Sequence, residues 1–258
     1  HMSLEGTDLD KLALSTEKLL AGTDSKITTI GYYCNPIQYA EHRKTLENVI
    51  CTAGEFGATH VSTFAGAWEG KPVESAYEEF GKVFRELADL AEEKGVKLGI
   101  ENCLMDGTWE HATCNIGFNP KAWEVMFEEV KNDNFGLEWE PTHQMVQLID
   151  PVTELRKWCK KIVHIHGKDA TIDWDAVRHS GTSGAVPFVW HRMPGFGDTN
   201  WRDIISILRS NGYEDDICIE GYHDPVYSGE LEMTGQLHAL NYLKWCRGGD
   251  FTPTPWAK

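Results

Sequence analysis

The segment KIVHIHGKD, residues 161–169, has the pattern of a buried strand that ends on polar side chains. Side chains alternate between the two faces of a strand, so His164 and His166 share one face. In a parallel α/β barrel, the last inward residue of each strand stands at the mouth where active sites form. The segment therefore predicts a functional His166 at the mouth and a buried His164 one layer below it.

Similar short apolar runs alternate along the chain with amphipathic stretches of about ten to twenty residues, a pattern typical of parallel βα units. Strands are predicted at 26–33, 59–64, 97–102, 135–140, 161–166 and 217–220. Helices are predicted at 8–21, 40–56, 73–94, 120–131, 151–160, 201–211 and 231–247, with long polar or glycine-rich loops at 103–119 and 170–200. The expected fold is a (β/α)8 TIM barrel that forms a single domain over residues 1–258, with His1-Met2 as a remnant of cloning.

The number of strands is smaller than this fold requires. A complete barrel has eight strands, and the sequence offers six. We therefore expect the chain to lack the first one or two N-terminal βα units. Since an open sheet edge exposes unpaired backbone groups, a homo-oligomer or a partner chain is expected to cover it.

The composition restricts the class of partner and the compartment. The chain has 40 acidic against 24 basic side chains and a formal net charge of −16, which disfavours nucleic acid and anionic membranes. Its seven cysteines include no CxxC pair, which favours a reducing compartment. The N-terminus has no signal-peptide pattern, and no apolar run reaches the length of a membrane span. A cytoplasmic protein with a small-molecule substrate is expected.

Three further strands end on carboxylates that would meet His166 at the mouth. The segments LGIE at 98–101, LEWE at 137–140 and ICIE at 217–220 end on glutamates 101, 140 and 220. Either Glu101 or Glu220 alone could be a solvent-facing strand end, but three converging carboxylates repel one another unless a cation lies among them. One divalent ion is expected there, with Mn²⁺ favoured over Mg²⁺, Co²⁺ or Zn²⁺ because oxygen ligands dominate.

Polar residues near these strand ends are candidates for other roles. Alternation places Glu138 on the same face of its strand as Glu140. Like His164, Glu138 is expected to lie in a hydrogen-bonded layer below the ligands. His143, Lys168 and Arg192 fall on loops after predicted strands, where substrate contacts form in such folds. These three residues are the predicted substrate-binding set.

Five segments in one order resemble the xylose isomerase-like barrel family of sugar phosphate isomerases and epimerases. They are IEN at 100–102, EWEPTH at 138–143, HIHGKDA at 164–170, RMPGFGDTNW at 192–201 and IEGYHD at 219–224. In that family Glu, Asp, His and Glu bind the metal, so the resemblance implies Glu101, Glu140, His166 and Glu220 as the ligands. Glu140 departs from the usual aspartate by one methylene.

The resemblance also implies a reaction. The chain is expected to be a metal-dependent isomerase or epimerase acting on a sugar, sugar phosphate or keto-polyol, in which Glu101 and Glu220 move a proton beside a carbonyl. One alternative is a dehydratase or lyase acting on a keto-inositol or 3-keto-glycoside. Another is a non-catalytic sugar-binding or partner subunit. Relatives of this fold that cleave damaged DNA have more histidine ligands, and the acidic charge disfavours that function.

Overall fold

The computed structural model describes residues 4–249 and 252–254, so the expected remnant of cloning at His1-Met2 lies outside the described residues. The chain divides into two compact units. The N-terminal unit holds the described residues up to Gln144 together with Lys161–Ile165, and the C-terminal unit holds Met145–Lys160 and the described residues from His166 onward.

Parallel strands form the centre of the N-terminal unit. They are β1 (Thr29–Gly31), β2 (His60–Thr63), β3 (Lys97–Glu101), β4 (Phe135–Trp139) and the first residues of β5 (Ile162–Gly167). Adjacent strands pair in this order and in parallel, with His60 opposite both Thr29 and Lys97. The carboxyl ends of these strands consequently lie at one edge of the sheet, which is where the predicted ligands fall.

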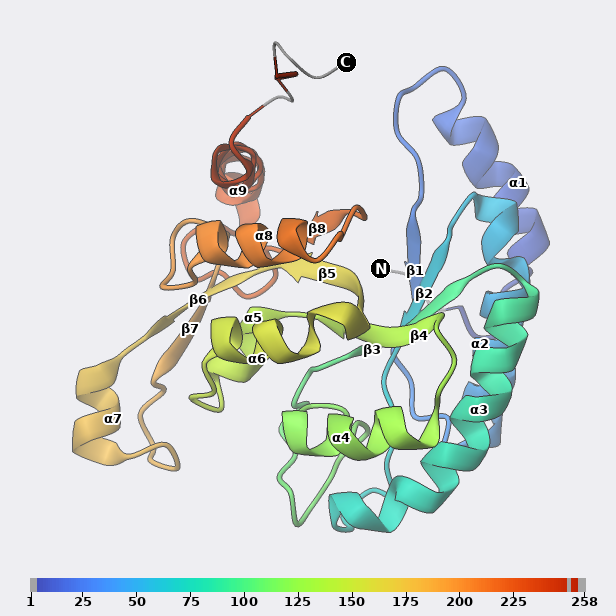
Figure 1. Ribbon diagram of the computed structural model, residues 1–258, viewed down its shortest axis with the longest axis horizontal. Coiled ribbons are helices and arrows are strands. Elements are labelled where there is room, and N and C mark those ends of the chain that lie inside the picture. The colour runs from blue at the N-terminus through green and yellow to red at the C-terminus, as the bar shows by residue number, and fades with distance from the viewer. Residues whose placement is uncertain (1–3, 250–251, 255–258) are drawn as a thin grey trace. The chain divides into compact units, whose positions relative to one another are not determined.

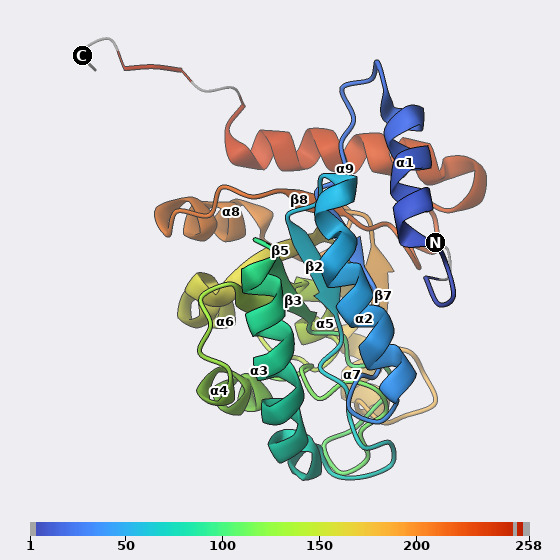
Figure 2. The same ribbon diagram turned by 90° about the vertical axis from the view of Figure 1, so that its right-hand side faces the viewer.

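Helices connect these strands and bury their apolar faces against them. They are α1 (Leu9–Leu20), α2 (Ala40–Thr52), α3 (Tyr77–Glu93) and α4 (Pro120–Glu129), and α2 and α3 run side by side in Figures 1 and 2. Phe80 and Phe84, one turn apart on α3, stack at 4.6 Å between ring centroids and contact Phe135 of β4. This aromatic cluster anchors α3 to the sheet, because fully buried aromatic side chains dominate the energetics of a core.

Three of the helices and one of the strands of the C-terminal unit accompany the end of β5. They are α6 (Pro151–Trp158), α8 (Trp201–Ser210), β8 (Ile217–Ile219) and α9 (Glu232–Arg247). The N–H of Glu220 donates to the carbonyl of Gly167 at 3.1 Å, which aligns the end of β8 with the end of β5. Asp150 and Asn200 cap α6 and α8, because their side chains accept hydrogen bonds from backbone N–H groups in the first turn of each helix.

The segment at 170–200 is not the open loop expected from the sequence. Strands β6 (Asp169–Ile172) and β7 (Val189–Arg192) form an antiparallel pair, and α7 (Trp174–Ser180) lies between them in the chain (Figure 1). Helix α7 has no buried residue, so it lacks the periodic apolar face by which a helix is detected in a sequence. Two predicted loop residues also lie in regular structure. His143 is on the short helix α5 (Pro141–Met145), and Arg192 is the last residue of β7.

The other predicted elements are present. Over the described part of the chain, the main parallel sheet has six strands in the order β1-β2-β3-β4-β5-β8, all within the predicted ranges or one residue beyond. No helix formed by the described residues combines the length and apolarity needed to cross a membrane.

Candidate active site

Two buried asparagines hold the end of β3 in the N-terminal unit. The Asn115 side-chain amide donates to the carbonyls of Glu101 and Cys103, at 2.9 and 2.8 Å, and its oxygen accepts from the N–H groups of Ala65 and Gly117, both at 2.9 Å. Asn115 is fully buried, so these four bonds are shielded from water. The backbone that carries Glu101 is therefore fixed on both sides of residue 102.

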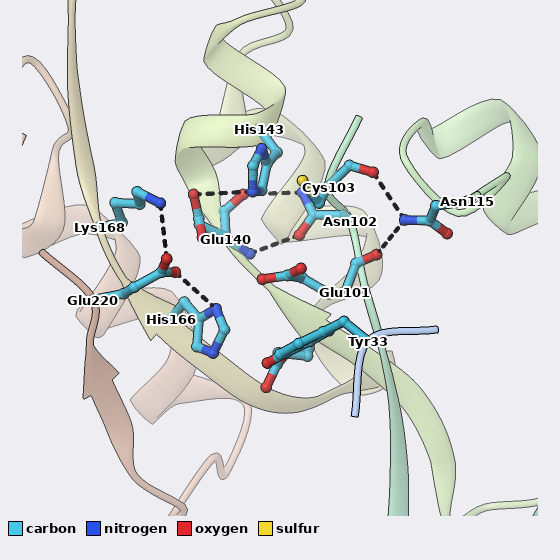
Figure 3. A network of polar contacts seen from close by, with 11 residues as sticks. Tyr33, Glu101, Asn102, Cys103, Asn115, Glu140, His143, His166, Lys168 and Glu220 are labelled. Carbon is cyan, nitrogen blue, oxygen red and sulfur yellow. Dashed lines mark hydrogen bonds and ion pairs between the residues drawn. The ribbon is translucent and has the colours of Figure 1, made fainter. Parts of the chain in front are cut away.

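The second asparagine, Asn102, ties β3 to the end of β4. Its amide nitrogen donates to the carbonyl of Glu140 at 2.9 Å, and its oxygen accepts from the N–H of Glu140 at 2.7 Å (Figure 3). One carboxylate oxygen of Glu101 and one of Glu140 lie within 4.8 Å of each other. The two residues are only 6% and 0% exposed. Two carboxylates this close and this buried repel strongly, and a cation between them removes the penalty. The residues present therefore fit a divalent ion.

His143 completes the polar set of the N-terminal unit. Its Nε2 lies 3.3 Å from a carboxylate oxygen of Glu140. Helix α5, which carries His143, is held by a 2.8 Å bond from the Trp139 indole to Gln144. The Cys103 Sγ, a ring nitrogen of His143 and an oxygen of Glu101 lie within 4.8 Å of one another. Cys103 was not among the predicted site residues. The signal for it was its spacing: it follows Glu101 by two residues, the separation of side chains that share one face of a strand.

Glu138 and His164 lie in a separate buried network of the N-terminal unit. The hydroxyl of Tyr33 donates to Glu138 at 2.8 Å, His164 Nε2 is 3.8 Å from the other Glu138 oxygen, and the Thr29 hydroxyl is 3.5 Å from His164 Nδ1. Glu138 and His164 face each other in the β4–β5 register. Each has hydrogen-bonding neighbours from other strands, as expected for residues below the strand ends.

The C-terminal unit brings three predicted residues together around one carboxylate. Lys168 donates to one Glu220 oxygen at 3.0 Å, and His166 Nδ1 lies 3.2 Å from the other (Figure 3). Lys168 is only 3% exposed, whereas Glu220 is partly open to solvent. The two nitrogen groups orient the carboxylate while leaving it accessible, an arrangement suited to proton transfer with a bound molecule.

Arg192, the third predicted substrate-binding residue, also lies in the C-terminal unit, where it pairs with Asp224. Its Nε donates to Asp224 at 3.3 Å, and its guanidinium carbon lies 5.8 Å from the Phe196 ring centroid. Asp224 also accepts from the N–H groups of Met193, Val226 and Tyr227, at 2.7, 2.8 and 2.8 Å. The structure therefore reveals Asp224 as a positioning residue for Arg192. In the sequence, Asp224 could be noticed only as the final residue of the IEGYHD segment.

A second buried aspartate, Asp169, shapes the turn that follows β7. It accepts from the N–H groups of Ala170, Gly195 and Thr199, at 2.9, 3.0 and 2.9 Å. A Cβ on Gly197 would lie 2.4 Å from an Asp169 oxygen, so only glycine fits beside it. Burial raises the pKa of Asp169, although these hydrogen bonds oppose the shift. The glycines of the RMPGFGDTNW segment thus allow the backbone to wrap around a carboxylate.

Comparison with known proteins adds a family and several relatives. Residues 5–244 match the family model described as xylose isomerase-like TIM barrel. The inosose dehydratase of Clostridium tetani is 26% identical over 182 residues, which cover 69% of this chain and 57% of that protein. The chain thus spans little more than half the length of this relative.

Solved structures resemble the chain at lower identity. The 3-keto-D-glucoside 4-epimerase of E. coli superposes with a TM-score of 0.67 at 14% identity, over 92% of this chain and 86% of that one. The IOLI protein, solved with a bound zinc atom, gives 0.64 at 21% identity, over 94% and 81%. Likeness at these identities concerns the fold.

Proposed function

This chain belongs to the xylose isomerase-like TIM barrel family, and from that premise we propose that it is a divalent-metal-dependent enzyme that transfers protons beside the carbonyl group of a sugar or keto-polyol. The observation that carries the proposal is the pair of buried carboxylates, Glu101 and Glu140, within 4.8 Å of each other. Isomerisation or epimerisation is the simplest outcome of such proton transfer, because it needs no further chemical step.

We assign the cation to Glu101 and Glu140 of the N-terminal unit and to His166 and Glu220 of the C-terminal unit. All four follow or end strands whose carboxyl ends form the active-site side of this fold. When bound, a divalent cation would supply Lewis-acid polarisation of the substrate carbonyl. Manganese is favoured by three carboxylates and one imidazole, with magnesium, cobalt and zinc as alternatives. The zinc in the IOLI structure supports a divalent ion without selecting it.

We assign the proton transfer to Glu101, which ends β3, and to Glu220, which follows β8. Glu220 removes the proton from the carbon beside the carbonyl, and the C–H electron pair moves into an enediolate. Glu101, protonated from water, gives its proton to the former carbonyl carbon for isomerisation, while the hydroxyl proton moves to the former carbonyl oxygen. For epimerisation, Glu101 gives its proton to the opposite face of the first carbon, and the carbonyl re-forms. His143, Lys168 and Arg192 donate hydrogen bonds to substrate oxygens. The contacts of Lys168 and His166 with Glu220 support its role, because they hold the carboxylate in one orientation.

Glu220→Gln tests this assignment directly. In D₂O with a panel of ketoses, the wild-type protein loaded with Mn²⁺ should incorporate deuterium beside the carbonyl. The variant should lose about 10²-fold or more of that exchange, since an amide cannot accept the proton. Glu214→Gln is the matched control, because Glu214 is an exposed glutamate of the same unit. Exchange at the wild-type rate in Glu220→Gln would refute the scheme.

A dehydratase is the second candidate, and the curated relatives favour it. Sequence relatives from several bacteria carry the name inosose dehydratase. The same proton removal would be followed by cleavage of a β C–O bond, with the electron pair leaving on a hydroxide that takes a proton from Lys168 or His143. Product mass after incubation with inosose separates the two reactions, because elimination removes one water and isomerisation leaves the mass unchanged. Binding of metal and sugar without either reaction would favour the non-catalytic alternative.

A further inference from the structure

We propose that Cys103 supplies a sulfur ligand to a cation held in the N-terminal unit, together with Glu101 and His143. The three donor atoms lie within 4.8 Å of one another. Ligands around a tetrahedral zinc or cobalt ion are separated by about 3.3–3.8 Å, given bond lengths of about 2.0–2.3 Å. The donor atoms therefore need to approach one another by at most about 1.0–1.5 Å. This inference shares Glu101 and His143 with the proposed function. It assigns His143 to the cation, through a ring nitrogen, in place of its proposed contact with substrate.

The three side chains are held in place by the fold. Glu101 and Cys103 have their carbonyls bound by the same buried asparagine, Asn115, at 2.9 and 2.8 Å. The carboxylate and the thiol face one region, because their donor atoms lie within 4.8 Å of each other. His143 approaches that region from α5, whose attachment to β4 is fixed by the Trp139 to Gln144 bond. The fold therefore holds the three donor groups near one another before a metal binds.

Burial and ligand type determine which ions this set prefers. Glu101 and His143 are buried, whereas Cys103 is half-buried. Thiolate is a soft ligand that favours Zn²⁺ and Co²⁺, whereas Mg²⁺ and Mn²⁺ prefer oxygen. The sequence-based preference for manganese considered only the four strand-end residues, so a sulfur ligand shifts the expected selectivity toward zinc and cobalt. Metal binding would also become sensitive to thiol reagents.

Cobalt titration of the metal-free protein tests the proposal without an activity assay. A thiolate bound to Co²⁺ gives a sulfur-to-cobalt charge-transfer absorption in the near ultraviolet, which oxygen and nitrogen ligands do not produce. The wild-type protein should develop this band. Cys103→Ser should abolish it and weaken cobalt binding by about tenfold or more, while Mn²⁺ affinity stays within about twofold. Cys114→Ser is the matched control, because Cys114 is a half-buried thiol of the same loop.

The possible outcomes separate this proposal from the proposed function. Cobalt binding without the band in wild-type protein, or a band that survives Cys103→Ser, overturns the sulfur ligand. If the band is absent but Mn²⁺ binding still depends on Glu220, only the sulfur ligand fails. If the band depends on Cys103 while Glu220→Gln changes neither Mn²⁺ binding nor deuterium exchange, the sulfur ligand stands and the proposed function fails.

Discussion

Asp224 is a buried carboxylate of the C-terminal unit that accepts hydrogen bonds from three backbone N–H groups and from Arg192. Burial alone would raise its pKa, but the N–H groups of Tyr227, Met193 and Val226, with Arg192, outweigh that effect and lower the pKa from the usual 3.8. A carboxylate whose pKa is lower in the folded than in the unfolded state stabilises the fold above the unfolded pKa. That contribution is lost as the pH falls through the folded pKa.

Asp224→Asn should therefore destabilise the protein in a pH-dependent way. An amide replaces one acceptor oxygen with a donor that faces backbone N–H groups, so the free energy of unfolding at pH 7 should fall by about 2–4 kcal/mol. The deficit should shrink as the pH falls below the usual 3.8 and through the lower folded pKa, because the wild-type carboxylate is then protonated too. Urea denaturation across this range measures it, with exposed Asp216→Asn as the control. A deficit that stays constant with pH would contradict the ionic role.

The approach of β4 to β5 depends on a glycine. A Cβ on Gly136 would lie 2.4 Å from the Lys161 carbonyl oxygen and 2.6 Å from a Val163 methyl group. The oxygen belongs to the backbone, so it cannot move aside without displacing the start of β5. Since β5 carries the predicted ligand His166 at its other end, this close approach links strand packing to the position of the site.

Gly136→Ala should lower the free energy of unfolding by about 1–3 kcal/mol, because the added methyl group overpacks a backbone contact. Gly54→Ala is the control, since no atom lies within 4 Å of its Cβ position and its φ is not positive. That substitution should be neutral or should stabilise by about 0.4–1 kcal/mol. Chemical denaturation of both variants provides the comparison. Equal free energies of unfolding for the two alanine variants would show that β5 can shift to make room for the methyl group without a loss of stability.

The elements differ in how well the sequence predicted them. Strands such as β3 and β8 have apolar runs that end on a carboxylate, so both the strand and its terminal residue could be predicted from alternation. The β6–β7 hairpin could not, because its strands are four residues each and are separated by a helix without a buried face. Asn115 was missed for a different reason: its partners include Ala65, fifty positions away in the chain. Such contacts exist only in the folded chain.

At the scale of the whole molecule, the family match confirms the expected α/β fold of the xylose isomerase-like type. Strand β5 begins in the N-terminal unit and ends in the C-terminal unit, with His166 and Gly167 beyond the division. The proposed ligands are likewise divided, with Glu101 and Glu140 in one unit and His166 and Glu220 in the other. The proposed ion should stabilise the folded chain, and the contribution of ligands from each unit can be measured.

Adding Mn²⁺ to the metal-free protein should raise its melting temperature. At a free metal concentration one hundred times the Kd, binding adds about 2.7 kcal/mol, or roughly 5–11 °C for a chain of this size. Glu140→Gln and Glu220→Gln should each remove most of the increase, although they lie in different units, whereas exposed Glu55→Gln should retain it. Calorimetry with and without a chelator measures the effect. Loss of the increase in Glu140→Gln alone would mean that the N-terminal unit holds the ion by itself, because a ligand that contributes nothing to affinity cannot contribute to stability through binding.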